Sequence, residues 1–224
     1  MKSEKNKKKI SQEDILRLLD ECYEKCLNGL PKISPTVEKM AQDYMKRYKT
    51  KEDACRAMLK NQVIKCTTSG ALSGLGGIIT LPVAIPANIG SVVYVQMRMI
   101  ACVAYMADFD LDSDQAQTFI YACLAGVALT GLVKQVGVKC GTKIISTLIK
   151  KIPGTLLTKI NQKVGFRLLT KFGSTGLINL GKLIPGVGAA IGGSFDLVET
   201  KAIAERAYNW FMKGDFSVKN TEKN

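Results

Sequence analysis

The stretch LPVAIPANIGSVVYVQMRMIACVAYMADFDLDSD, residues 81–114, is the most apolar long part of the chain and decides the fold class. Proline fits the first turn of a helix and disfavours helix just before itself, so Pro86 predicts a helix that runs to about Met106. Such a helix holds roughly 20 residues and spans about 30 Å. Its apolar residues cover every side, which is typical of a helix at the centre of a core or in a membrane.

One charged residue, Arg98, lies deep in this predicted helix. A charge in apolar surroundings must be paired or must reach water. Asp196 is the first acid after a long gap and also has apolar neighbours, so we treat Arg98 and Asp196 as a candidate buried polar pair. A snorkelling arginine, an arginine paired elsewhere and a role in holding a ligand or a lipid headgroup remain open.

Helix signals also precede the central stretch. Ser11 with Asp14 has the spacing of a capping box and predicts a helix that ends at Gly29. Ser34-Pro35 predicts the start of a second helix, and Thr50 predicts the cap of a third. The second helix carries an amphipathic stripe formed by Val37, Met40, Ala41, Tyr44, Met45 and Tyr48.

Further helices are predicted after it. Asp112 is expected to cap a long helix over about 113–136, followed by basic helices over 138–151 and 155–172 and a mostly helical segment over 183–213. No alternating strand pattern occurs. We therefore predict an all-α fold of about eight helices, a helical bundle with apolar central helices and an amphipathic N-terminal helical arm.

Charge is distributed unevenly along the chain. Residues 134–182 hold ten lysines and arginines, and no Asp or Glu occurs between Asp114 and Asp196. Basic amphipathic helices bind anionic membrane surfaces. We therefore predict anionic membrane lipid as the partner of this segment, and its candidate lipid-surface contacts are Lys139, Lys143, Lys150, Lys151, Lys159, Lys163, Arg167 and Lys171.

The same segment leaves other interpretations open. It could be a solvated basic face over a soluble core, or the face of an adaptor that meets an acidic protein. Nucleic acid is not expected as a partner, because no helix-turn-helix, zinc module or aromatic base-stacking platform is visible. Two uncharged windows, 66–97 and 115–133, are borderline for crossing a membrane. With no apolar segment after the basic N-terminus, we expect a location on the cytoplasmic side of the membrane, peripheral or partly inserted.

No catalytic constellation is visible. The chain contains no histidine, which removes Ser-His and Cys-His pairs and most zinc sites. Its seven cysteines are scattered without a CxxC motif and are expected to be reduced. DFDLDSD, residues 108–114, resembles the start of a calcium loop, but Ser113 and Phe119 occupy the positions that need glycine and glutamate. We therefore expect a non-enzymatic protein without metal or cofactor; an enzyme or carrier acting on a lipid-like ligand near Arg98 remains the rival hypothesis.

The segments LPVAIPANIGSVVYVQMRMIACVAY, DLDSD and KCGTKIISTLIKKIPGTLLTKINQKVGFRLL resemble the EcsC protein family, and the likeness runs from about Gly74 to Ala207. That family is bacterial, and its namesake is encoded beside an ABC exporter linked to secretion. The resemblance implies a helical fold, membrane association and a role in envelope or secretion functions, with a membrane protein or transporter as a candidate partner. It implies no site residues. The expected organisation is a disordered basic tail over 1–10, amphipathic helices over 11–68, an EcsC-like core over 69–213 and a polar tail over 214–224.

Overall fold

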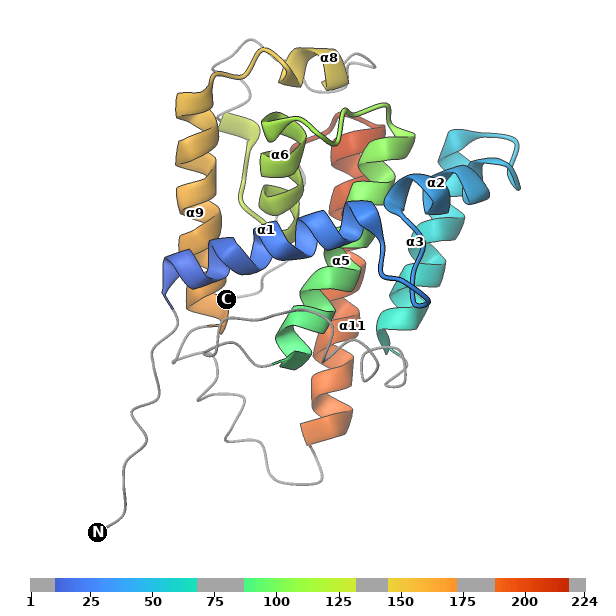
Figure 1. Ribbon diagram of the computed structural model, residues 1–224, viewed down its shortest axis with the longest axis horizontal. Helices are drawn as coiled ribbons and strands as arrows, with labels where there is room; N and C mark the ends of the chain where they lie inside the picture. Colours follow the sequence, from blue (N-terminus) through green and yellow to red (C-terminus); the bar gives the residue numbers. More distant parts are fainter. Residues whose placement is uncertain (1–10, 68–86, 132–144, 173–187, 218–224) are drawn as a thin grey trace.

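The computed structural model describes residues 11–67, 87–131, 145–172 and 188–217, and these residues form an all-α bundle (Figure 1). They contain eight α-helices, a short π-helix and no strand, so the predicted fold class is confirmed. The elements are α1 (Gln12–Asn28), α2 (Val37–Met45), α3 (Lys51–Thr67), α5 (Ala87–Met106), α6 (Asp114–Ala125), α8 (Ile145–Ile149), α9 (Gly154–Phe172), α11 (Gly188–Ala207) and the π-helix η1 (Tyr208–Met212).

Helix α5 is the central element of the bundle. Its bounds, Ala87–Met106, confirm the predicted central helix. Helices α1, α2, α3, α6 and α11 all pack against it, and α1 crosses in front of it in the view of Figure 1. Tyr94, Met97 and Ile100 are among its fully buried side chains. The all-round apolar character of this helix is therefore explained by neighbours on several sides, which together form one hydrophobic core.

Helix α1 begins and ends as predicted. The Ser11 side chain accepts a hydrogen bond from the backbone N–H of Asp14, whose carboxylate accepts one from the N–H of Ser11, which completes a capping box. The helix ends at Gly29, which has φ +73° and ψ 179°. This conformation is essentially restricted to glycine. The buried face of α1 comprises Ile15, Leu18, Leu19, Cys22, Tyr23 and Cys26.

The next two helices differ little from their predictions. Thr36 caps α2, and Thr50 accepts a hydrogen bond from the N–H of Asp53 at the start of α3. The apolar stripe of α2 is shorter than predicted. The helix ends at Met45, and Tyr48 lies beyond it with 41% of its surface exposed.

Helix α6 corrects two predictions. Its cap is Ser113, whose side chain accepts a hydrogen bond from the N–H of Ala116, and not Asp112. The helix ends at Ala125 and does not continue through residue 136, because Gly126 adopts the left-handed conformation with φ +68° and terminates it. Residues 132–144 lie outside the described ranges, and with them the first half of the basic helix predicted over 138–151. The structure describes its second half, which contains α8.

The last helices run alongside the core. Helix α9 confirms the basic helix predicted over 155–172. Helix α11 runs parallel to α5 (Figure 1). Two contacts in the same order along both segments show this: Gln96 donates a hydrogen bond to Thr200, and further on Phe109 packs edge-on against Phe211. The π-helix η1 continues α11, and Gly214 with φ +66° follows it, as predicted.

No helix within the described ranges has both the length and the hydropathy that crossing a bilayer requires. Of the two borderline windows, 66–97 lies mostly outside those ranges, and 115–133 is interrupted at Gly126.

Candidate functional site

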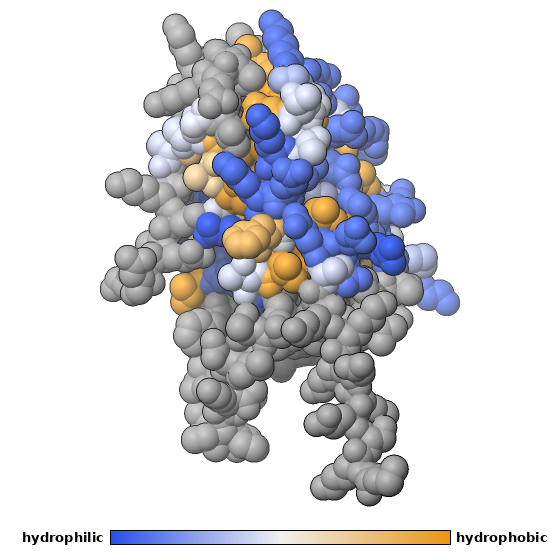
Figure 2. All heavy atoms as spheres, turned by 90° about the vertical axis from the view of Figure 1, so that its left-hand side faces the viewer, coloured by the Kyte–Doolittle hydropathy of each residue, from blue (hydrophilic) through white to orange (hydrophobic). Residues whose placement is uncertain are grey.

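The outer face of α9 carries cations and one large apolar side chain. Leu157, Ile160, Val164 and Leu168 are buried at the spacing of one helix side. On the opposite side Lys159, Lys163 and Phe166 are exposed; we call these three residues the α9 face. Phe166 has 68% of its surface exposed. Figure 2, which views the molecule from the side of α9, shows hydrophobic side chains lying among hydrophilic ones.

Two of the predicted lipid-surface contacts take part in ion pairs. Lys150 lies 3.7 Å from a carboxylate oxygen of Asp110, in the acidic turn before α6. Lys171 pairs with Glu199 of α11. The charge of these two lysines is therefore partly neutralised within the molecule.

The other predicted contacts differ in exposure. Lys159 and Lys163 are exposed on α9, and Lys151 is exposed just after α8. Arg167 is half-buried and takes part in a further interaction. Lys139 and Lys143 lie outside the described residues. The structure therefore brings two of the eight cations together with Phe166.

A groove of about 1,220 Å³ runs between α9, α11 and the C-terminal end of α6; we call it the α9–α11 groove. Its floor is apolar, with Leu124, Val127 and Ile203 buried beneath it. Phe166 of α9 and Val198 of α11 both line it, and each has 68% of its surface exposed. The groove can therefore offer an apolar ligand contacts on both sides.

Charged side chains border this groove. The cations are Lys163, Arg167, Lys171, Lys201 and Arg206, and the carboxylates are Glu199 and Glu205. Arg206 is buried and donates a hydrogen bond of 2.7 Å to the carbonyl oxygen of Cys123, in the last turn of α6. A cation at this position stabilises a helix because it meets the negative end of the helix dipole. The net formal charge around the groove is positive.

The predicted pair of Arg98 and Asp196 is only half described. Arg98 is 4% exposed, and its guanidinium donates weak hydrogen bonds to Tyr94 Oη at 3.4 Å and to Met40 Sδ at 3.6 Å. The contact with Met40 of α2 places the guanidinium on the α2 side of α5, whereas α5 reaches α11 through Gln96. The Asp196 side chain lies outside the described residues, so the pairing stays a prediction.

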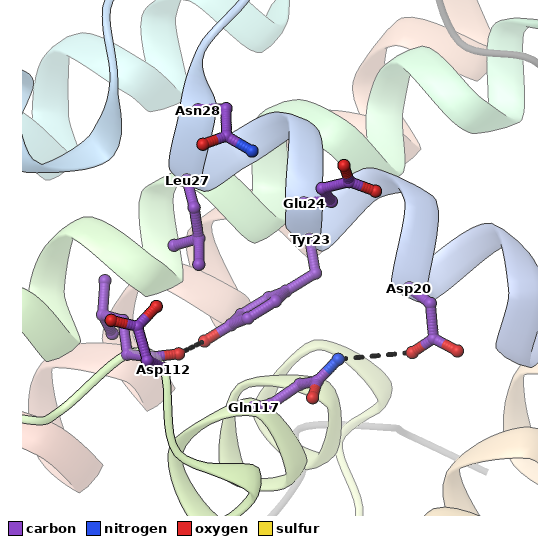
Figure 3. A pocket seen from close by; sticks show the side chains of 8 residues that line it. Asp20, Tyr23, Glu24, Leu27, Asn28, Asp112 and Gln117 are labelled. Carbon is purple, nitrogen blue, oxygen red and sulfur yellow. Dashed lines mark hydrogen bonds between the residues drawn. The ribbon is translucent and has the colours of Figure 1, made fainter.

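A second, smaller pocket of about 350 Å³ lies between α1 and the turn before α6 (Figure 3). Asp20, Glu24 and Asp112 give it a negative character. Asp20 accepts hydrogen bonds from Tyr121 at 2.8 Å and from Gln117 at 3.3 Å. These bonds connect α1 to α6, so this cluster holds the two helices together.

Membership of a family follows from comparison with known proteins. The model of the EcsC protein family matches residues 4–213. The chain belongs to the EcsC protein family. The EcsC match extends further towards the N-terminus than the likeness over 74–207, and it includes α1, α2 and α3. No curated protein and no solved structure matches the chain.

The buried cysteines of this EcsC protein are poor nucleophiles. Burial raises the pKa of the Cys22, Cys55 and Cys123 thiols to about 12. A thiol with such a pKa is almost entirely protonated at neutral pH, and the thiolate is the reactive form. Within the described ranges, no group of three or more Cys, Asp or Glu side chains could hold a metal ion. These three buried thiols are therefore not candidates for a catalytic nucleophile.

Sequence reasoning identified the cations of α9 but missed the groove. Its walls come from three separate helices, and no local sequence pattern predicts that these helices lie close together. One local signal was available: Val198 and Phe166 are the large apolar residues that lie between charges on otherwise polar helix faces.

Proposed function

We propose that this EcsC-family chain is a non-enzymatic protein that binds anionic membrane surfaces through the α9 face, on the cytoplasmic side of the membrane. The observation that carries the proposal is Phe166, which is exposed one helical turn beyond Lys163 and two turns beyond Lys159. An exposed phenylalanine beside lysines matches what the interface between lipid headgroups and acyl chains offers.

The expected energies make the binding reversible. Each lysine near an anionic surface contributes about 1 kcal/mol, and burying Phe166 in the acyl region contributes roughly 2 kcal/mol. A single helix face therefore gives weak binding, which salt should reverse because it screens exposed charges. Such an attachment suits a peripheral protein that supports an envelope or secretion system.

Liposome flotation tests this proposal. The full chain should float with vesicles that contain phosphatidylglycerol, and flotation should fall at high salt and with neutral phosphatidylcholine vesicles. The whole chain carries a formal charge of +13, so weak attraction to any anionic surface is expected and must be separated from binding by α9. Two variants that change the net charge by the same amount, at different places on the molecule, separate these two effects.

The decisive pair of variants is Lys159→Glu/Lys163→Glu and the matched control Lys39→Glu/Lys60→Glu. All four lysines are exposed, and Lys39 and Lys60 belong to α2 and α3, away from α9. We expect the α9 variant to reduce the partition coefficient at least tenfold and the control to reduce it much less. Equal losses would mean that net charge alone drives binding. No flotation with either kind of vesicle would favour an adaptor that binds an acidic protein.

A further inference from the structure

The α9–α11 groove has an apolar floor, and one exposed apolar side chain lies on each of its two sides. Among the described residues, Phe166 and Val198 are the most exposed of the large hydrophobic side chains, and they line the same groove from different helices. Leu124, Val127 and Ile203 extend the apolar surface inward. Contiguous apolar surface of this kind often marks a binding site, whereas single exposed apolar residues scattered over a surface need no explanation.

The length of the groove indicates how long a ligand lying along it would be. Its volume of about 1,220 Å³ exceeds the roughly 300–1,000 Å³ that is usual for small-molecule pockets. Along α9 it extends from Gln162 to Lys171. At 1.5 Å per residue this is about 14 Å. An extended chain advances about 3.5 Å for every three bonds, so about 12 bonds fit this length.

The charged side chains at the edge of the groove indicate which polar head group such a ligand would carry. Lys171 and Glu199 neutralise one another at one end, and Arg206 is engaged with α6. Lys163 and Lys201 are exposed, and neither has an ion-pair partner in the part of the chain that the structure describes. Glu205 also lines the groove, is exposed and has no ion-pair partner among the described residues, so it offsets one of these two cations. The net charge that is left to meet a ligand is still positive, which favours an anionic head.

We propose that the α9–α11 groove binds one molecule of a medium- or long-chain fatty acid, with its acyl chain along the apolar floor and its carboxylate at the cationic rim. The site differs from the rival ligand site near Arg98, which lies on the α2 side of α5. It also goes beyond surface binding, because the ligand is a single molecule taken from solution and its binding needs no vesicle.

Titration calorimetry with the delipidated full chain tests the apolar floor. Octanoate, decanoate and laurate are added below their critical micelle concentrations. Each buried methylene strengthens binding by up to about fourfold, so we expect affinity to rise roughly five- to fifteenfold for every two methylenes. An affinity that does not depend on chain length, or no binding of laurate by the folded chain, would overturn the proposal.

Two substitutions locate the site. Val198→Asp places a carboxylate on the α11 rim and should weaken laurate binding at least tenfold, whereas Ile33→Asp, at another exposed apolar position, should leave it unchanged. Lys201→Glu should weaken laurate and strengthen dodecylammonium, a gain that a misfolded variant would not show. Equal effects of Val198→Asp and Ile33→Asp, or wild-type affinity for dodecylammonium equal to that for laurate, would show non-specific association instead.

One further variant separates this proposal from the membrane-surface proposal. Lys159 belongs to the α9 face but does not line the groove. Lys159→Glu should reduce flotation with anionic vesicles and preserve laurate binding. Val198→Asp should weaken laurate binding and preserve flotation. If Lys159→Glu lost laurate binding and Val198→Asp kept it, the ligand would lie on the α9 face and not in the groove.

Discussion

At the scale of single residues, the backbone conformation of Gly29 shapes the turn that connects α1 to α2. A Cβ added there would lie 2.6 Å from the carbonyl oxygen of Ser34, and the left-handed φ adds strain. We expect Gly29→Ala to lower the free energy of unfolding by about 1–3 kcal/mol. Gly154→Ala is the control, because a Cβ at that position meets no atom within 4 Å. It should be neutral or slightly stabilising.

Urea denaturation measures both glycine variants. Trp210 is the sole tryptophan and is buried, so its fluorescence reports on unfolding of the core. Equal stabilities of Gly29→Ala and the wild type would contradict the strain assigned to this turn.

The thiols give a second prediction at this scale. Burial raises the pKa of Cys22, Cys55 and Cys123 from an ordinary value near 9 to about 12 and also raises the pKa of Cys26 and Cys102. Above pH 9 the unfolded chain loses protons that the folded chain keeps, so unfolding is favoured as pH rises. Each such thiol should lower the free energy of unfolding by up to about 1.4 kcal/mol per pH unit in this range.

Alkylation provides the measurement. In a Cys66→Ser/Cys140→Ser background, the folded chain should incorporate almost no iodoacetamide at pH 8, and the denatured chain should incorporate it at the remaining cysteines. Rapid labelling of the folded chain would mean that the helices open far more often than a packed core allows. Denaturation midpoints between pH 8 and 10.5 check the predicted loss of stability.

At the scale of helices, boundaries set by neighbouring residues were predicted better than boundaries set by packing. The capping box at Ser11 and the proline before α5 are interactions within a few residues, so the sequence contains them in full. The end of α6 at Gly126 was not predicted. Glycine within an apolar run is compatible with a continuing helix, and the left-handed conformation is set by what packs around it.

At the scale of sites, the same distinction between local and distant information holds. The spacing of Lys159, Lys163 and Phe166 could be read from the sequence, because residues on one helix face are close along the chain. The groove could not, because Phe166 and Val198 come to line the same groove only when α9 and α11 are both packed against α6. The ion pair between Lys171 and Glu199 was hidden for the same reason.

At the scale of the whole molecule, two faces differ in character. Helix α9 presents cations and Phe166, while the opposite part of the bundle, α2 and α3, carries acids and bases together. The turn before α6 also neutralises cations, through the pairs Lys51–Asp108 and Lys150–Asp110. If the proposed membrane binding is correct, it therefore takes place on one side of the bundle, with α9 facing the lipid.

Fluorescence from residue 166 tests that orientation most directly. In a Phe166→Trp/Trp210→Phe variant, the indole is expected to be exposed to water without lipid. Addition of phosphatidylglycerol vesicles should shift its emission to the blue, brominated acyl chains should quench it, and high salt should reverse both changes. Emission that stays at the wavelength of exposed tryptophan while the protein floats with these vesicles would contradict the account.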